Sequence, residues 1–394
     1  MTALETLLVG QSGGPTPVIN ASLAGVIEGA RGRFRRILGL RHGIEGALAG
    51  QTVDLTELAD ADLRALRRTP AAALGSCRHK LDAAGIQSVV SLLRSENVRA
   101  FAYIGGNDSM DTCARLGRAA SESGWPLAVY GVPKTIDNDL VGTDHCPGYG
   151  SAARYWAIST QEATRDLAAM RTYDRVLILE CAGRNAGWLA ASTALYRRGE
   201  CDGPHVLLVP ERSFNRDAFL SAVEEAVGRV GYCVVAAAET IRDAGGAFVA
   251  QSVSGTDRFG HAIVTAVGET LAQLVGRELQ LKARANKPGT FQRTSMAYAS
   301  PVDQEEAFQA GRAAVERLAD KESGRMVAFA RRTAEPYACD LASVALDDVA
   351  NSERRVPDDF LLEEDGVVTG LADAFRAYAL PLLGPAPEPH FSLA

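Results

Sequence analysis

Short apolar runs that end in glycine- or acid-rich turns and then lead into helical stretches recur along most of this chain. The runs expected as buried strands are LETLLVG (4–10), RAFAYIGG (99–106), PLAVYGVP (126–133), DRVLILECAG (174–183), HVLLVP (205–210) and GYCVVAAAE (231–239). Strand, turn and helix repeated in this way predict an α/β fold of parallel sheets with helices on both faces. In such sheets ligands bind at the carboxyl ends of the strands, which is where these turns lie.

The charge balance narrows the classes of partner. The chain has 48 acidic and 41 basic residues, a net charge of −7, which argues against nucleic acid or an anionic membrane surface as the main partner. Its seven cysteines are scattered without a CxxC pair, and no stretch reads as a signal peptide or a membrane span. These features predict reduced thiols in a cytoplasmic protein. The six histidines form no HxH or HExxH pattern, so we expect no zinc site.

Two glycine turns follow predicted strands. GQSGGPTPVIN (10–20) leads into a helix whose free amides favour an anion, although the stretch is neither a Walker A loop nor a GxGxxG fingerprint. GGNDS (105–109) offers a similar cradle but carries an acid, a poor neighbour for a polyanion. A tight turn explains the first equally well, and a capped helix start explains the second.

The stretch PKTIDNDL (133–140) is more specific. Asp137 and Asp139 follow a predicted strand, and Lys134 and Thr135 come just before them. One aspartate can act as a general base towards a hydroxyl, the other can hold Mg²⁺, and the lysine can neutralise phosphate oxygens. The alternative is an Asx-rich turn.

Arginines gather in two further stretches. RVLILECAGRNAGW (175–188) places Arg175 before a strand and Arg184 after it, and LKARANKPGTFQRTS (281–295) contains two lysines and two arginines. In an acidic protein such clusters favour a phosphate pocket, because guanidinium groups bind phosphate through two hydrogen bonds. Solvated surface loops are the alternative.

Taken together, these stretches resemble the phosphofructokinase family, and its bacterial pyrophosphate-dependent branch in particular. The resemblance runs from residue 5 to the final helices through QSGGPTPVINASLAGVI, TPAAALGSCRHKL, GGNDSMDT, GVPKTIDNDL, GRNAGWLAAS and PGTFQRTS, in that order. It implies two Rossmann-like parallel-sheet domains with the active site in the cleft between them. The expected division is a larger domain over 1–145, a second over 146–310, and a C-terminal helical region and tail over 311–394, part of which packs back on the first.

The resemblance also assigns roles. It implies Mg²⁺ as cofactor, pyrophosphate as co-substrate, a sugar phosphate as acceptor, and a homodimer or homotetramer with shared active sites. Asp137 would take the proton from the sugar 1-hydroxyl, and Arg175 would reach the 6-phosphate of a neighbouring subunit. The catalytic residues implied are Lys134, Thr135, Asp137 and Arg184, and the metal ligands implied are Asn107 and Asp139. The residues implied to bind the phosphoryl donor are Gly13, Arg78, Gly105, Gly106, Asp108, Ser109 and Lys134. The residues implied to bind the acceptor are Thr135, Ile136, Asp137, Arg175, Ala182, Gly183, Arg184, Glu239, Arg284, Thr290 and Arg293.

Two positions indicate the phosphoryl donor. In the ATP-using branch of the family, glycines stand at the positions of Asp108 and Lys134, and the α-phosphate of ATP passes over the backbone there. By this resemblance, a carboxylate at 108 would fill that space and repel the extra phosphate, and Lys134 could pair with the terminal phosphate of pyrophosphate. The sequence therefore predicts pyrophosphate rather than ATP as the phosphoryl donor. A non-catalytic protein that only binds phosphates is the alternative from another class, but it predicts loss of the base, and Asp137 is present.

Departures from the family pattern cluster on the acceptor side. Ala182 stands where a methionine usually packs against the sugar, and Thr290 stands where other branches have His or Tyr. One further departure lies outside the acceptor side: Asn107 of the predicted metal site stands where many relatives have an acid. The reaction implied is transfer to fructose 6-phosphate, giving fructose 1,6-bisphosphate reversibly. The room beside Ala182 keeps open a different acceptor, such as sedoheptulose 7-phosphate or a cyclitol phosphate of secondary metabolism.

Overall fold

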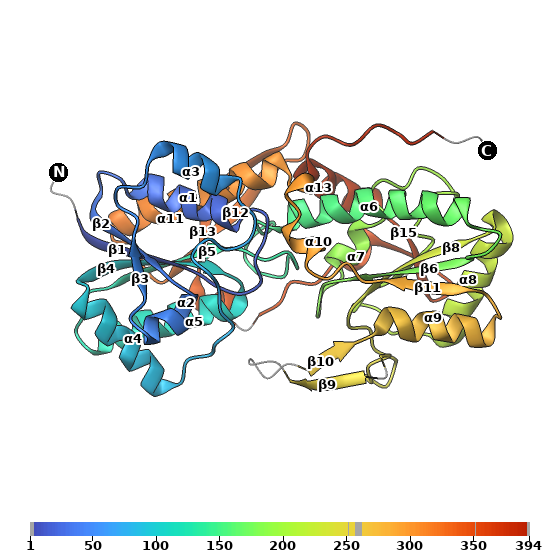
Figure 1. Ribbon diagram of the computed structural model, residues 1–394, viewed down its shortest axis with the longest axis horizontal. Coiled ribbons are helices and arrows are strands. Elements are labelled where there is room, and N and C mark those ends of the chain that lie inside the picture. The colour runs from blue at the N-terminus through green and yellow to red at the C-terminus, as the bar shows by residue number, and fades with distance from the viewer. Residues whose placement is uncertain (1–3, 251, 257–261, 351, 392–394) are drawn as a thin grey trace.

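The computed structural model describes residues 4–250, 252–256, 262–350 and 352–391, and arranges them as two α/β domains side by side (Figure 1). The first domain has a seven-stranded sheet in the order β13-β12-β5-β4-β1-β2-β3. Its strands are β1 (Leu4–Gln11), β2 (Phe34–Leu40), β3 (Thr52–Asp54), β4 (Val98–Gly105), β5 (Ala128–Pro133), β12 (Arg325–Thr333) and β13 (Ala338–Ala345). The central strands are parallel, whereas β3 and β13 are antiparallel to their neighbours.

Two hydrophobic cores cover the two faces of this sheet. One face carries α1 (Ile19–Ala30), α3 (Asp60–Arg67) and α11 (Pro301–Ala319). The other carries α2 (Gly43–Leu48), α4 (Ala83–Ser95), α5 (Asn107–Glu122) and α12 (Leu346–Val349). β1 and β4 are neighbours in the sheet, and the chain continues from β1 to β2 on one side and from β4 to β5 on the other. The sheet therefore has a topological switch point between β1 and β4. Ligands bind at such a point, outside the carboxyl ends of the strands.

The second domain has a six-stranded sheet in the order β11-β6-β8-β7-β15-β14. Its strands are β6 (Val176–Cys181), β7 (Val206–Leu208), β8 (Cys233–Ala238), β11 (Ala283–Asn286), β14 (Leu361–Glu364) and β15 (Val367–Leu371). The helices α6 (Tyr149–Ala169), α7 (Trp188–Ser192) and α13 (Asp373–Leu383) lie on one face, and α8 (Arg216–Val230) and α9 (Val267–Glu278) lie on the other (Figure 1). Shorter elements are β9 (Ser252–Thr256), β10 (Ala262–Thr265), α10 (Phe291–Thr294), η1 (Met296–Tyr298) and η2 (Asp358–Phe360).

The chain passes between the two domains three times. It leaves the first sheet after β5, returns through η1 into α11, and leaves again after α12 towards β14. The helix α11 packs along α1 of the first domain, and α13 packs on α6 of the second. The late part of the chain therefore contributes to both cores.

The predicted α/β fold with two largely parallel sheets is confirmed, and each of the six predicted strands is a strand of the structure. The prediction of a helical region over 311–394 is wrong, because this region supplies β12 and β13 to the first sheet and β14 and β15 to the second. β13 and β14 are half-exposed strands at sheet edges, so they lack the continuous apolar runs by which the central strands were found. In the part of the chain that the structure describes, no helix is both long and apolar enough to cross a membrane.

Candidate active site

The turn after β1 approaches the segments that follow β4 and β5. Gly13 adopts φ 76°, a conformation that favours glycine, and its amide donates to the carbonyl of Cys77 at 3.2 Å. The hydroxyl of Ser76 donates to the carbonyl of Gly13 at 2.6 Å. A Cβ atom at Gly14 would lie 3.9 Å from Nη2 of Arg78, so these contacts bring Arg78 to the glycine turn.

Lys134 lies at the centre of this region. Its side chain is 3% exposed, and its Nζ donates to the carbonyl of Gly14 at 2.7 Å. Burial lowers the pKa of Lys134 to about 8, with Arg293 and Arg78 acting in the same direction and Asp137 in the opposite one. A lysine ammonium held out of water in this way gains from an anionic ligand, because the ligand replaces the lost hydration.

The stretch GGNDS spans the junction of β4 and α5. Gly105 ends the strand, Gly106 precedes the helix, and Asn107 begins it, so the amides of the first turn lie at the switch point. Asp108 is exposed in that first turn, whereas Ser109 is buried. A carboxylate there is favoured by the helix dipole, so the position of Asp108 has a local structural cause as well as the functional one that we predicted.

Asn107 and Asp139 are brought together as the sequence predicted. Nδ2 of Asn107 donates to Oδ2 of Asp139 at 3.3 Å. Oδ1 of Asn107 is buried and has no hydrogen-bond partner among the described residues. An unpartnered amide oxygen beside a carboxylate is a donor set that suits Mg²⁺, which prefers oxygen ligands.

Asp137 and Asp139 lie in the turn that follows β5, between the two domains. Burial raises the pKa of Asp137 above its usual range, Glu239 raises it further, and Lys134 and Arg184 oppose the rise. Burial and then the charge of Asp137 raise the pKa of Asp139. The raised pKa of such a carboxylate is closer to the pKa that an effective general base has near neutral pH.

The turn is held in a defined shape by its own backbone. The amide of Asp137 donates to Oγ1 of Thr135 at 3.1 Å, and the amide of Thr135 donates to the carbonyl of Pro147 at 3.1 Å. Ile136 between them is 9% exposed and packs into the core of the second domain. The segment that carries the two aspartates is therefore anchored on both domains.

Several residues of the second domain that we predict to bind the acceptor lie at the carboxyl ends of β6 and β8. Gly183 adopts φ 123°, where a side chain would be strained, and Ala182 and Arg184 flank it. The amide of Glu239 donates to the carbonyl of Cys181 at 2.8 Å. Burial raises the pKa of Glu239, and Lys287 and Arg184 lower it.

The PGTFQR stretch brings two more predicted residues to this edge. Oε1 of Gln292 accepts from the amide of Ala182 at 2.8 Å and from Nε1 of Trp156 at 3.0 Å. This buried amide fixes α10, and with it Thr290 and Arg293, against the ECAGR turn. A Cβ atom at Gly14 would lie 3.2 Å from Nη1 of Arg293, so Arg293 reaches the glycine turn after β1 of the first domain.

Two predicted arginines lie elsewhere. Arg175 precedes β6, and Nε of Arg175 donates to the carbonyl of Gly231 at 2.7 Å. Arg284 is near the start of β11, where it pairs with Asp166 and, at 3.6 Å, with Asp174. Since β6 and β11 are parallel, both arginines lie at the amino-terminal ends of these strands, about 20 Å along β6 from Arg184. The expectation that Arg284 and Arg293 share one pocket within a chain is not met.

Sequence reasoning missed two residues of this region. Gln292 lies inside the PGTFQR stretch, but the prediction of a phosphate pocket depends only on the cations of that stretch. Glu180 is 1% exposed, accepts from the amide of Gly268 at 2.8 Å and pairs with Lys287. A glutamate within an apolar strand run is unusual, and that was the available signal.

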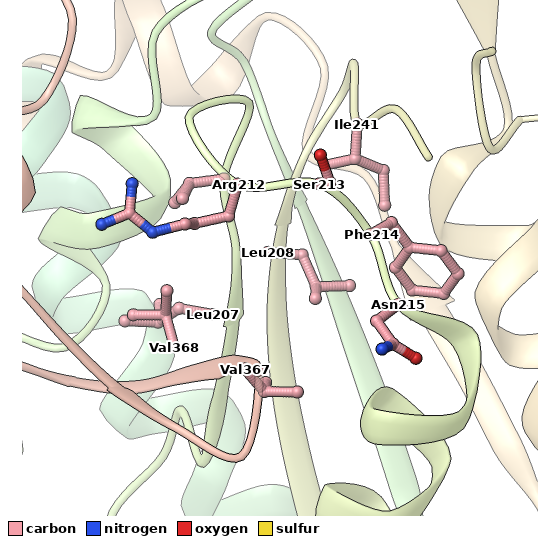
Figure 2. A pocket seen from close by; sticks show the side chains of 11 residues that line it. Leu207, Leu208, Arg212, Ser213, Phe214, Asn215, Ile241, Val367 and Val368 are labelled. Carbon is pink, nitrogen blue, oxygen red and sulfur yellow. The ribbon is translucent and has the colours of Figure 1, made fainter. Parts of the chain in front are cut away.

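A small hollow between β7, β15 and the segment before α8 is separate from this region (Figure 2). Leu207, Leu208, Phe214, Ile241 and Val368 line it together with Arg212. The residues that line it include none of the predicted site residues. The candidate active site is thus the junction of the two domains at the carboxyl edges of both sheets.

Comparisons with known proteins agree on one family. The phosphofructokinase family profile matches residues 6–318. The chain is 44% identical over 388 residues to a pyrophosphate–fructose 6-phosphate 1-phosphotransferase of Xanthomonas campestris pv. campestris, covering 97% of this chain and 92% of that protein. It is 36% identical over 358 residues to a sulfofructose kinase of Alkalicoccus urumqiensis, covering 90% and 91%. A crystal structure of pyrophosphate-dependent phosphofructokinase from Marinobacter aquaeolei superposes with a TM-score of 0.86 at 36% identity, covering 99% of this chain and 94% of that one.

Proposed function

The chain belongs to the phosphofructokinase family, and we propose that it transfers a phosphoryl group from pyrophosphate to the 1-hydroxyl of fructose 6-phosphate. The observation that carries the proposal is Lys134, buried at the carboxyl end of β5 and bonded to the glycine turn after β1. Arg78, Arg293 and the first turn of α5 lie around it. A buried ammonium among further cations suits a short, highly charged donor such as pyrophosphate.

In this mechanism Asp137 accepts the proton of the 1-hydroxyl while that oxygen attacks the near phosphorus of pyrophosphate. The new O–P bond forms as the bridging P–O bond breaks, and orthophosphate leaves with the bridging oxygen. Lys134, Arg78 and the amides of α5 stabilise the charge that gathers on the leaving group. Such a transition state needs alignment and charge neutralisation more than covalent participation by the protein.

Asn107 and Asp139 would hold Mg²⁺, and the unpartnered Oδ1 of Asn107 beside the Asp139 carboxylate supports this role. The ion, when bound, neutralises charge on the phosphoryl oxygens. Thr135 would contact the transferring group, and Ala182, Gly183, Arg184 and Glu239 would hold the sugar. Arg293 and Thr290 would hold its 6-phosphate.

Arg175 and Arg284 would serve the active site of a neighbouring subunit. Both lie at the amino-terminal edge of the second sheet, away from Arg184 and Arg293 of the same chain. A symmetric oligomer that brings this edge to the acceptor side of a second copy would complete each site with two arginines. We therefore propose a homo-oligomer with shared active sites.

A second acceptor class is favoured by one observation. Ala182 offers a methyl group where the sugar would pack, and a 36% identical relative is named sulfofructose kinase. Because this relative is named for a different acceptor, further ketose phosphates and sulfonates should be tested as acceptors. The chemistry at Asp137 would be the same for each.

The test is an acceptor panel assayed with pyrophosphate and with ATP, each with Mg²⁺. We expect turnover of fructose 6-phosphate with pyrophosphate and none with ATP. Turnover with ATP alone would overturn the assignment of pyrophosphate as donor. Turnover of another acceptor, without turnover of fructose 6-phosphate, would overturn the assignment of fructose 6-phosphate as acceptor. The double variant Asp108→Gly, Lys134→Gly should weaken pyrophosphate binding and admit ATP, and failure to bind ATP would contradict the proposed exclusion.

A further inference from the structure

Arg354 contacts the turn that carries the two aspartates, although it lies more than two hundred residues further along the chain. It belongs to the segment between α12 and η2, where the chain passes from the first domain to the second. Its amide donates to the carbonyl of Asp139 at 2.7 Å. Its Nε and Nη2 donate to the carbonyl of Asn138 at 3.2 and 3.1 Å, and its Nη1 donates to the carbonyl of Asp144.

The carbonyl that receives the guanidinium belongs to an unusual residue. Asn138 lies between Asp137 and Asp139, is fully buried, and adopts φ 57°, in the left-handed region that few residues other than glycine favour. Its Oδ1 accepts from the amide of Cys146 at 3.0 Å, and its Nδ2 donates to the hydroxyl of Tyr378 at 2.8 Å. A backbone held in this region needs support from its surroundings, because the conformation itself costs about 1 kcal/mol or more.

Tyr378 of α13 completes the arrangement. Its hydroxyl accepts from Nη2 of Arg354 at 3.0 Å and donates to the carbonyl of Asp144 at 2.9 Å. Together with the bond from Asn138, this uses the one donor and both acceptor positions of a phenol. Arg354 and Tyr378 thus bind the backbone at both ends of the turn, at Asn138 and at Asp144.

The same arginine contacts the second domain at the acceptor side. Its guanidinium lies over the ring of Trp188, 4.5 Å from the ring centre, and Nε1 of Trp188 donates to the carbonyl of Arg354 at 3.1 Å. Trp188 begins α7, four residues after Arg184, and is 1% exposed. Arg354 is therefore packed between the turn that carries the base and the helix that follows the sugar-binding turn.

We propose that Arg354 is a positioning residue for phosphoryl transfer, which holds the carboxylate of Asp137 in line with the acceptor hydroxyl by fixing the peptide of Asn138. This inference rests on the proposed function. A lysine keeps the charge, but its three N–H donors share one nitrogen, so it cannot replace the planar fork that binds the carbonyls of Asn138 and Asp144 together. A small displacement of a catalytic group costs about a hundredfold in rate, so the effect belongs to kcat rather than to binding.

The test compares Arg354→Lys with a matched control, Arg197→Lys. Arg197 is also a partly buried arginine that binds a backbone carbonyl, that of Thr369 at 2.6 Å. Among the described residues, its side chain makes no hydrogen bond or ion pair with the turn or with α7. We expect Arg354→Lys to lower kcat roughly 10- to 100-fold while the KM for pyrophosphate changes less than about threefold. Arg197→Lys should leave both constants close to those of the wild type. Tyr378→Phe, which removes one hydroxyl, should lower kcat by a smaller factor.

Hydrogen–deuterium exchange gives a readout that needs no turnover. In Arg354→Lys, amides of 136–146 should exchange about tenfold faster or more, while those of β7 keep their wild-type rate. Wild-type kcat in Arg354→Lys, or equal loss of kcat in Arg197→Lys, would overturn the inference, as would unchanged exchange. If the wild-type protein itself fails to use pyrophosphate, the proposed function fails, and the exchange data still decide whether Arg354 fixes the turn.

Discussion

The donor half and the acceptor half of the active site are built in different ways. On the donor side, Lys134, Arg78 and the first turn of α5 gather at the carboxyl edge of one sheet, and Lys134 is buried there. On the acceptor side, the cations are divided between the two ends of β6 and β11. Under the proposed function, one chain would enclose the site of the diphosphate by itself, whereas the site of the sugar phosphate would depend on the surface that a neighbouring copy presents.

Asp137 stands on the border of the two halves, and its removal has the largest expected effect. Asp137→Asn keeps the shape but cannot take a proton, so kcat should fall about 10²- to 10⁴-fold. Pyrophosphate binding, measured by calorimetry, should persist because the donor half does not need the base. Since burial raises the pKa of Asp137, the wild-type kcat should fall on the acid side at a pH above the usual range of an aspartate.

Asp347→Asn is the matched control, because Asp347 is an exposed carboxylate of α12 that pairs with Arg118. It should leave kcat unchanged. Retained turnover in Asp137→Asn would remove this residue from the role of base. Loss of pyrophosphate binding in the same variant would show instead that the two halves are not separable.

Subunit mixing tests the division of the acceptor half. Arg284→Ala should lower kcat/KM for the sugar phosphate roughly a hundredfold, because a phosphate would lose a paired arginine. When Arg284→Ala and Asp137→Asn chains are unfolded and refolded together, about a quarter of the sites in a random mixture should have both residues, so activity should return.

The control for this experiment is Arg216→Ala, which removes an exposed arginine that also pairs with two carboxylates, those of Asp217 and Glu278. It should leave kcat/KM unchanged. A mixture that stays inactive while its chains co-assemble would place Arg284 outside the partner's site, and the two halves would then differ less than we propose.

The pH dependence of pyrophosphate binding probes the donor half alone. Burial lowers the pKa of Lys134 to about 8, so in the free protein its charge is present below that pH and is lost above it. The KM for pyrophosphate should therefore rise above pH 8, by about fivefold between pH 8 and about pH 9. In Lys134→Arg the positive charge persists over this pH range, so the KM for pyrophosphate should change less with pH. A KM that falls with rising pH would contradict the assignment of Lys134 to the donor.

Ala182→Met has the smallest expected effect and concerns the acceptor half alone. A larger side chain beside the sugar should reduce the room for bulkier acceptors, changing the ratio of kcat/KM between acceptors by about fivefold to tenfold. The KM for pyrophosphate should not change. An equal change for all acceptors would show that residue 182 does not contact the part of the substrate by which they differ.

The sequence predicted the central strands well because buried parallel strands form continuous apolar runs, and β1, β4, β5, β6 and β8 all have that pattern. The residues that we predict to bind the donor lie at one edge of the first sheet, because the carboxyl ends of neighbouring parallel strands meet there. The juxtaposition of Asn107 with Asp139 follows from the adjacency of β4 and β5.

The position of Arg284 could not be predicted in the same way. The motif that contains Arg284 and Arg293 is contiguous in sequence, but β11 begins beside the first residue and ends before the second. An extended strand separates residues by about 3.3 Å each, so neighbours in a motif can face opposite ends of a sheet. Arg354 was missed for another reason, because its contacts with Asn138 and Asp144 join segments more than two hundred residues apart.

The three passages of the chain between the domains have a consequence for engineering. A cut at any one of them leaves a fragment without part of its own sheet, since β12 and β13 of the first sheet come after the whole of α6 to η1. Grafting an acceptor half from a relative with another substrate therefore requires three simultaneous splice points, one of which runs through Arg354. Exchange of acceptor preference by recombination is accordingly harder in this architecture than exchange by point substitution at the sugar-binding turn.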